Sequence, residues 1–180
     1  MELPKEARTV ERLVQQYYEA LYRYAFRLSG STADAEDLVQ EAFCKAQASI
    51  RQLREPGKAK AWLFCILTNA YLYRTRLERR RRYVSLENLD SLPELLPDEL
   101  PAIDAQQLQE ALNELPEAFR SPVILYYFEE FSYRDIAEQM DLPLGTVMSR
   151  LARAKTYLRA KLLRPAPSLA ERPRRTSDGL

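Results

Sequence analysis

The sequence predicts an all-α protein with two small helical domains joined by a flexible acidic linker. Apolar residues recur at helical spacing through most of the chain, and no alternating run indicates a strand. A segment rich in proline and acids interrupts the helical pattern in the middle of the chain. We therefore expect a domain over residues 1–83, a linker over 84–104, a second domain over 105–164 and a disordered tail over 165–180.

The first two helices follow from apolar spacing and capping residues. The first is closed by Ser29 and Gly30, and Ser31 is placed to cap the second, whose first turn is acidic. The first buried stripe is expected to contain Val14, Tyr17, Tyr18, Leu21, Ala25 and Leu28.

A third helix is expected from about Ala59 to Arg82, with two dissimilar faces. One face is the expected core stripe of this helix, namely Leu63, Ile66, Ala70, Tyr73 and Leu77. The other interleaves aromatic rings with small polar groups before an arginine run, a pattern typical of surfaces that stack unpaired bases. It comprises Phe64, Thr68, Tyr71, Thr75 and Arg79, and the alternative is that its rings pack against another element.

The net charge of +1 hides a segregation of charge along the chain. Residues 1–83 hold 16 basic and 10 acidic side chains, whereas residues 84–104 hold 6 acidic side chains and no basic one. The acidity of this segment either keeps it off DNA, mimics DNA, or serves solubility. Its prolines, Pro93, Pro97 and Pro101, favour a linker.

The second domain is expected to contain a helix-turn-helix. Ser132 is placed to cap a helix over Tyr133–Met140, residues 141–145 break it, and Thr146 is placed to cap a basic amphipathic helix that ends at Leu163. The buried stripe of this last helix is expected to be Val147, Leu151, Ala154, Leu158 and Leu162.

The opposite side of the last helix suits the major groove of DNA. Arg binds two acceptors of guanine, Ser bonds to several base edges, and an Ala methyl contacts thymine. The alternative is a solvated basic face on a packing helix. The outer residues are Ser149, Ala152, Arg153 and Thr156, with the phosphate-binding candidates Arg150, Lys155, Arg159 and Lys161 on the flanks.

The composition argues against an enzyme. Histidine, a glycine loop for phosphate and a metal-ligand cluster are all missing, so we expect no catalytic residue, no metal, no cofactor and no small-molecule substrate. Cys44 and Cys65 are interpreted as small core residues, with thiol sensing as the alternative. No signal peptide or membrane span is recognised, so a cytoplasmic location is expected.

Three blocks in this order resemble the two-domain bacterial sigma factors of the extracytoplasmic-function (ECF, group IV) branch of the sigma-70 family. The resemblance covers about residues 10–164. The blocks are the acidic segment 34–43, the segment from Ala61-Trp62-Leu63 through Asn69 to Arg76, and the segment from Leu115-Pro116 to 145–154.

The resemblance implies that this chain directs promoter-specific initiation by RNA polymerase. It places the β′ clamp helices of core polymerase on Asp34, Asp37, Gln40 and Glu41. It places −10 DNA on Phe64, Thr68, Asn69, Tyr71, Tyr73, Arg76, Arg79 and Arg80, with a loop over residues 50–60 that holds an extruded base. It places −35 DNA on Thr146, Met148, Ser149, Arg150, Ala152 and Arg153.

Further partners follow only from the resemblance. They are the β flap, through the apolar segment 122–128, and an anti-sigma factor that in this family often holds the protein at the membrane. Met148 stands where the family usually has Lys or Arg, and Tyr73 stands where it has a polar residue. The promoter sequence that the family recognises is therefore not assumed for this chain. The alternatives are a helix-turn-helix regulator that needs no polymerase, and a sigma mimic that titrates an anti-sigma factor.

Overall fold

The computed structural model describes residues 5–79 and 104–163, with side chains for residues 9–76 and 104–163. These residues form helices and turns and contain no strand, which confirms the predicted all-α class. The N-terminal helices are α1 (Lys5–Ser29), α2 (Thr32–Ser49) and α3 (Ala59–Arg79), with 3-10 turns at Ile50–Gln52 and Pro56–Lys58. The C-terminal helices are α4 (Ala105–Glu114), α5 (Glu117–Tyr127), α6 (Tyr133–Met140) and α7 (Leu144–Leu162).

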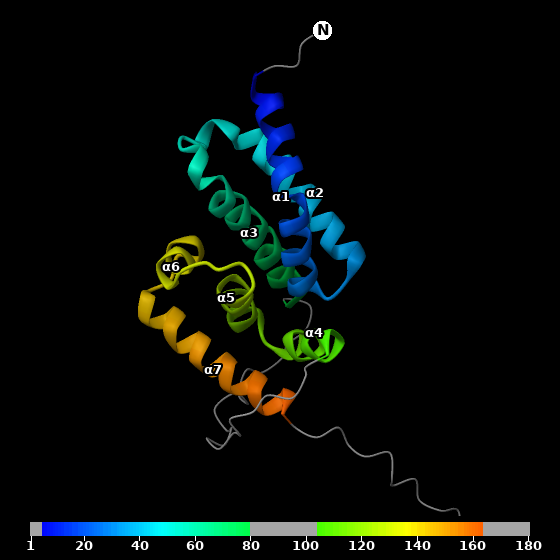
Figure 1. Ribbon diagram of the computed structural model, residues 1–180, viewed down its shortest axis with the longest axis vertical. Helices are drawn as coiled ribbons and strands as arrows, with labels where there is room; N and C mark the ends of the chain where they lie inside the picture. Colours follow the sequence, from blue (N-terminus) through cyan, green and yellow to red (C-terminus); the bar gives the residue numbers. More distant parts are fainter. Residues whose placement is uncertain (1–4, 80–103, 164–180) are drawn as a thin grey trace, which may run out of the picture.

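The N-terminal helices form a three-helix bundle, as predicted (Figure 1). Leu21, Ala25 and Leu28 of α1 are fully buried, in agreement with the expected stripe. Tyr18 is 44% exposed, so its assignment to the core was wrong. The core instead takes in Tyr24, a residue that the spacing argument left out.

A tight turn joins α1 to α2. Gly30 has a φ of 71°, a conformation that side chains rarely adopt, and its N–H donates to the carbonyl of Phe26. Ser31 caps α2, as predicted, because its hydroxyl accepts from the Asp34 amide over 3.3 Å.

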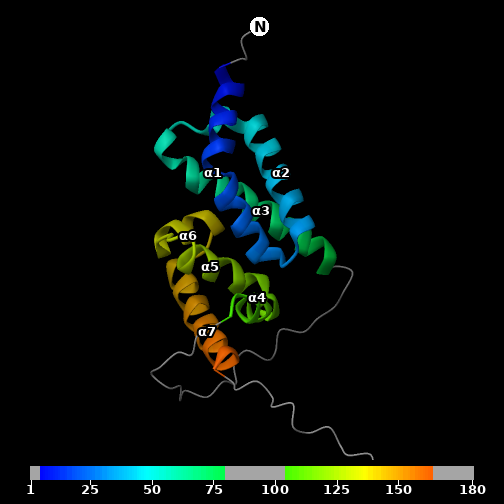
Figure 2. The same ribbon diagram turned by 45° about the vertical axis from the view of Figure 1, so that its right-hand side comes forward.

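Helices α6 and α7 pack on α5, and α4 packs on α7. Figure 2 shows α5 between α7 and the N-terminal bundle. Residues 121–125 of α5 are buried, with Pro122 inside the helix. Val147, Leu151, Ala154 and Leu158 of α7 are also buried, which confirms most of the predicted stripe, and Leu162 is partly buried.

The two helical units pack against each other. Helices α4 and α5 contact α1, and α5 and α6 contact α3, so the buried residues form one continuous cluster (Figures 1 and 2). The described residues leave out Arg80, the expected tail and all of the expected linker except Asp104.

Candidate functional site

Helices α6 and α7 form the predicted helix-turn-helix. The Ser132 hydroxyl accepts from the Asp135 amide over 3.2 Å, and the Asp135 carboxylate accepts from the Ser132 amide over 3.0 Å. This reciprocal capping box fixes the start of α6. The helix ends at Met140, and the residue after it, Asp141, adopts the left-handed conformation with a φ of 52°.

The start of α7 differs from the prediction. The helix begins at Leu144, and Pro143 occupies the cap position, so Thr146 does not cap it. The extended backbone of Pro143 directs its carbonyl at the first turn, where it accepts from the Thr146 and Val147 amides. Thr146 is therefore inside the first turn and half-buried.

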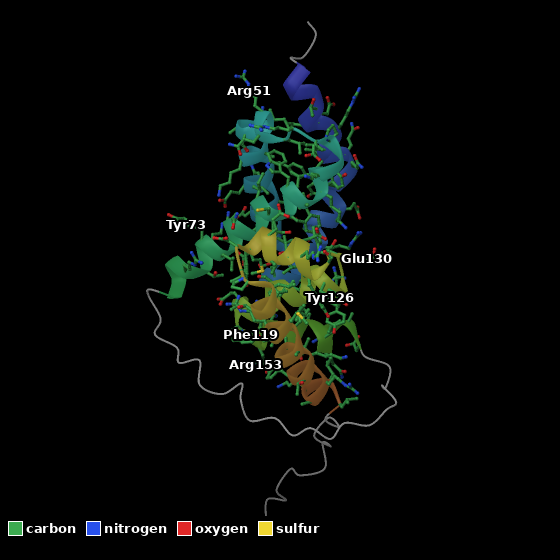
Figure 3. All side chains as sticks on the ribbon, turned by 90° about the vertical axis from the view of Figure 1, so that its left-hand side faces the viewer. Arg51, Tyr73, Phe119, Tyr126, Glu130 and Arg153 are labelled. Atoms are coloured by element: carbon green, nitrogen blue, oxygen red, sulfur yellow. The ribbon has the colours of Figure 1, made fainter. Side chains whose placement is uncertain are left out.

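The outer face of α7 is accessible to solvent. Met148 is 51% exposed, Ser149, Ala152 and Arg153 are also exposed, and Arg150 is half-buried. The Ser149 hydroxyl donates to the Thr146 carbonyl over 3.0 Å, so it retains its acceptor lone pairs for an incoming donor. Of the six predicted −35 residues, all except Thr146 therefore lie on this face or at its edge. Figure 3 illustrates this for Arg153.

A polar clamp fixes the far end of α7 to α4. The Glu114 carboxylate accepts from the Tyr157 hydroxyl over 2.6 Å and pairs with Lys161 over 2.9 Å. These two contacts lower the pKa of Glu114, while burial and the carboxylate raise the pKa of Tyr157 to about 12. The clamp sets the orientation of α7 relative to the rest of its domain.

The outer face of α3 is not the one that the sequence predicted. Asn69, Tyr73 and Arg76 are exposed and lie on one side of the helix. Tyr73 is 62% exposed, and Figure 3 shows it on the outside of α3. Tyr73 was expected in the core stripe, and that expectation is wrong. Leu63 and Ala70 of that stripe are buried as predicted, and Ile66 is half-buried. The buried side of α3 is wider than one stripe because α3 packs against two sets of helices, α1 and α2 on one side and α5 and α6 on another.

Three of the predicted −10 residues are buried beneath this second contact. Phe64 packs between the rings of Tyr24 and Phe131, at centroid distances of 5.0 and 5.3 Å. Thr68 is fully buried, and Tyr71 is 5% exposed. The expectation that these three side chains form an open stacking surface is therefore wrong for this arrangement of the helices.

A hydrogen-bond chain satisfies the buried polar groups. Thr68 Oγ1 donates to the Phe64 carbonyl over 2.7 Å, lies 2.8 Å from the Tyr24 hydroxyl and accepts from Gln139 Nε2 over 3.0 Å. Burial raises the pKa of Tyr24 well above its ordinary value. Of the remaining predicted −10 residues, the side chain of Arg79 and the whole of Arg80 lie outside the described residues.

The acidic helix α2 presents most of its predicted contacts to solvent. Asp34, Asp37 and Gln40 are exposed. Glu41 is half-buried and already paired, 2.6 Å from Arg74 and 2.7 Å from Lys45. The hydrogen bond from Lys45 and the neighbouring Arg74 lower the pKa of Glu41.

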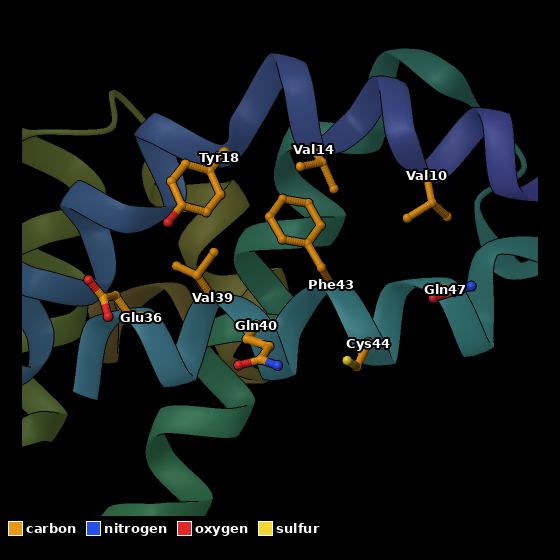
Figure 4. A pocket seen from close by; sticks show the side chains of 9 residues that line it. All are labelled: Val10, Val14, Tyr18, Glu36, Val39, Gln40, Phe43, Cys44 and Gln47. Atoms are coloured by element: carbon orange, nitrogen blue, oxygen red, sulfur yellow. The ribbon is translucent and has the colours of Figure 1, made fainter. Parts of the chain in front are cut away.

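An apolar groove runs between α1 and α2 beside this acidic surface (Figure 4). Its volume is about 430 Å³, and Gln40 stands on its wall. Cys44 also lines it and is exposed, so the interpretation of Cys44 as a core residue was wrong, whereas Cys65 is half-buried. The apolar lining comprises Val10, Val14, Tyr18, Val39 and Phe43.

Sequence reasoning missed the residues that join the two helical units. Each is polar and makes a contact with a residue far along the chain, and they are Lys60, Arg120, Glu129 and Gln139. A polar residue that is buried only by a second domain has no periodic signal, so spacing alone does not find it.

Two family models match the chain. Sigma-70 region 2 matches residues 13–82, and sigma-70 region 4 matches residues 105–158. The chain is 33% identical over 160 residues to the ECF RNA polymerase sigma factor SigL of Mycobacterium tuberculosis, covering 87% of this chain and 90% of that protein. It is 37% identical over 169 residues to the ECF RNA polymerase sigma factor SigE of Mycolicibacterium smegmatis, covering 89% of this chain but only 64% of that longer protein.

A solved structure matches over a similar extent. It is the sigma factor RpoE of Bartonella quintana in complex with the anti-sigma factor NepR. The match has a TM-score of 0.68 and 31% identity, and it covers 84% of this chain and 95% of that one. Among the residues that the structure describes, no helix is both long and apolar enough to cross a membrane.

Proposed function

This chain belongs to the ECF sigma factors of the sigma-70 family, and we propose that it binds core RNA polymerase and directs initiation at promoters with −10 and −35 elements. The observation that carries the proposal is the accessible outer face of α7, with Ser149, Ala152 and Arg153, on a helix-turn-helix with a complete capping box. Group IV membership and the domain limits 1–83, 84–104, 105–164 and 165–180 are part of this proposal.

The −35 element is read by α7. Arg153 is the candidate for a bidentate contact with guanine, Ser149 for a base edge and Ala152 for a thymine methyl. Arg150, which is half-buried at the edge of the face, is better placed for a phosphate. Met148 adds an apolar side chain to the same face, a feature that distinguishes this helix from a purely cationic one.

The −10 element meets the outer face of α3. Asn69 and Arg76 supply hydrogen-bond donors, and the exposed ring of Tyr73 supplies a platform on which a base can stack. Arg79 and Arg80 follow in the sequence and extend the cationic surface. Phe64, Thr68 and Tyr71 reach DNA only after α5 and α6 leave α3.

Core polymerase docks on α2 through Asp34, Asp37 and Gln40, beside the apolar groove. Carboxylates and an adjoining apolar groove suit a basic amphipathic helical partner such as the β′ clamp helices. Glu41 contributes after it exchanges its partners Arg74 and Lys45. In the second domain, Tyr127 is 49% exposed and is the accessible member of the segment proposed for the β flap.

The protein carries out no covalent chemistry itself, since bond formation belongs to the polymerase. An anti-sigma factor controls it, as the NepR complex of the similar Bartonella sigma factor suggests. The sigma factor acts in the cytoplasm, and a membrane-held anti-sigma factor holds it inactive at the membrane.

The test is transcription of fragmented host genomic DNA by core polymerase with and without this protein, with every new RNA 5′ end mapped. New starts that share two spaced elements are the expected result. Core binding without new starts would indicate a sigma mimic, and duplex DNA binding without core binding would indicate a plain helix-turn-helix regulator.

Two matched variants assign the surfaces. Gln40→Ala with Asp37→Ala is expected to weaken core binding without changing the fold, because both side chains are exposed. Tyr73→Ala is expected to leave core binding intact and to reduce promoter opening, measured by permanganate reactivity of unpaired thymines. Unchanged opening by Tyr73→Ala would remove Tyr73 from the −10 surface.

A further inference from the structure

Two of the exposed side chains on α7 are large and apolar. Met148 is 51% exposed, and Leu144, the first residue of the helix, is 42% exposed. Neither belongs to the continuous cluster of buried residues through which α7 packs on α4, α5 and α6. Single exposed apolar residues need no explanation, but a group of them on one helix face indicates a surface that binds another molecule.

These two side chains belong to a row along the outer side of α7. Leu144, Met148 and Ala152 are spaced four residues apart, so successive members lie about 40° apart around the helix and about one turn apart along it. All three are exposed, and we call them the apolar row. The row presents methyl and methylene groups and one thioether sulfur. It can therefore recognise an apolar group of a ligand but not a charged one.

A polar row runs beside the apolar row. It consists of Gly145, Ser149 and Arg153, which are also spaced four residues apart and are all exposed. The Ser149 hydroxyl can accept a hydrogen bond, and the Arg153 guanidinium can donate several. A Cβ atom placed on Gly145 would meet no atom within 4 Å, so the surface is open there and the backbone is accessible to a close ligand.

The major groove of DNA presents both kinds of group. Guanine offers two acceptors to an arginine, and thymine carries a 5-methyl group next to its O4 acceptor. In helix-turn-helix proteins, residues near the N-terminus of the second helix contact the base edges. Leu144 and Met148 lie in the first two turns of α7, and Figure 1 shows this end of the helix beside α6 at the edge of the molecule.

The spacing along α7 indicates where a thymine should lie. Met148 and Arg153 are five residues apart in the sequence. Five residues of helix rise by roughly 7.5 Å, and one base pair occupies about 3.4 Å of duplex. We therefore expect a thymine, on either strand, about two base pairs from the guanine that Arg153 contacts.

We propose that the apolar row reads the 5-methyl group of a thymine in the −35 element, with Met148 as the central contact and Leu144 beside it. The inference deepens the proposed sigma function and rests on it. Duplex DNA is the favoured occupant of the row because basic residues lie around it, namely Arg153 in the polar row and Lys155 about two turns beyond Met148 on the same side. The row thus selects thymine by apolar contact, whereas the polar row selects its bases by hydrogen bonds.

Replacement of thymine by uracil tests the contact, because uracil keeps every hydrogen-bonding group of thymine and lacks only the 5-methyl group. The holoenzyme is bound to a promoter located by mapping RNA 5′ ends, and each thymine of the −35 element is replaced singly on either strand. We expect one or two of these positions to lose roughly fourfold in affinity, which corresponds to about 0.8 kcal/mol for a group the size of a methyl.

Matched variants identify the residue that contacts the methyl group. With Met148→Ala, thymine and uracil are expected to bind equally at the sensitive position. Met148→Gln keeps the length of the side chain but makes its end polar, so it should also bring the thymine-to-uracil ratio close to one. Leu144→Ala should reduce the ratio by a smaller amount. Ser149→Ala, a change in the polar row, is the control and should keep the ratio of the parent protein.

Cytosine provides an independent measurement. A cytosine at the sensitive position lacks the methyl group, and 5-methylcytosine carries it on a base whose exocyclic group donates instead of accepting. Methylation of that cytosine should therefore strengthen binding roughly fourfold in the parent holoenzyme. The same methylation should have no effect on the holoenzyme with Met148→Ala.

Several results would overturn this reading of thymine. One is equal affinity for thymine and uracil at every −35 position, and another is a −35 element with no thymine near the expected position. A thymine-to-uracil ratio that survives Met148→Ala combined with Leu144→Ala would also remove the row from the contact. A loss of core binding by Met148→Ala, with the ratio unchanged, would assign the row to a protein partner instead.

The two proposals fail in different ways. If core polymerase with this protein gives no promoter-specific starts, the sigma function fails and the reading of thymine fails with it. If such starts appear, and thymine and uracil are equivalent throughout the −35 element, only the reading of thymine fails.

Discussion

Helices α3 and α7 are both proposed to read DNA, yet they differ in how they are buried. Helix α7 packs through one stripe, Val147 to Leu158, and leaves its outer face to solvent. Helix α3 packs through one stripe within its own bundle and through further residues against the second domain. The comparison shows that the outer face of α7 is accessible as it stands, whereas part of α3 is covered by the second domain.

The largest expected effect tests whether α3 is buried both within its own bundle and by the second domain. Phe64→Ala removes a ring that packs against Tyr24 within the bundle and Phe131 across the domain contact. We expect the free energy of unfolding to fall by about 3–5 kcal/mol, measured by urea titration. Met148→Ala, an exposed change on α7, is the control and should alter stability by less than about 0.5 kcal/mol. Similar effects of the two changes would contradict the comparison.

The next effect tests whether α7 reads bases. Arg153→Ala should cost about 1–3 kcal/mol in binding of the holoenzyme to its preferred promoter and should relax the sequence preference at one −35 position. The measurement is a competition among promoters that differ at single −35 positions. An equal loss on every sequence would make Arg153 a phosphate contact instead.

A smaller effect tests the support of α7. Ser132→Ala removes one half of the capping box of α6 and should lower the stability of the C-terminal domain by about 1 kcal/mol. Hydrogen exchange is the measurement, since it resolves the two domains. Equal loss of protection in α2 would show that the domains unfold as a single unit.

The smallest effect concerns pH. Burial raises the pKa of Glu129 above its ordinary value, although Lys60, Arg27 and Arg23 oppose this shift and Glu130 adds to it. Because the pKa is raised in the folded protein, protonation favours the fold, so the contribution of Glu129 to stability grows as pH falls through that pKa. The difference in the free energy of unfolding between the parent protein and Glu129→Gln, measured by urea titration at a series of pH values, should therefore change with pH in that direction.

The success of sequence reasoning differed between the same two helices. Helix α7 packs against helices of its own domain, so a period of 3.6 residues located its buried stripe. Helix α3 also packs against helices that are distant in the sequence, so its buried side is wider than the predicted stripe. Leu63 and Ala70 are buried as predicted, but Tyr73, which was assigned to the core, is exposed. The capping of α2 and α6 was predictable because Ser31 and Ser132 act within their own turns. The start of α7 was not, because Pro143 rather than Thr146 supplies the cap.

Gly30 shows how one turn of the N-terminal bundle limits variation in the chain. Its φ of 71° disfavours any residue with a side chain, whatever space surrounds it. A Cβ atom at this position would also lie 2.6 Å from Asn113 Nδ2, but the nearest atoms all belong to the end of that side chain, which can rotate away. The backbone of the turn, and not the neighbouring α4, therefore sets the requirement for glycine at residue 30, so a substitution there is expected to strain the corner between α1 and α2 rather than to push α4 away.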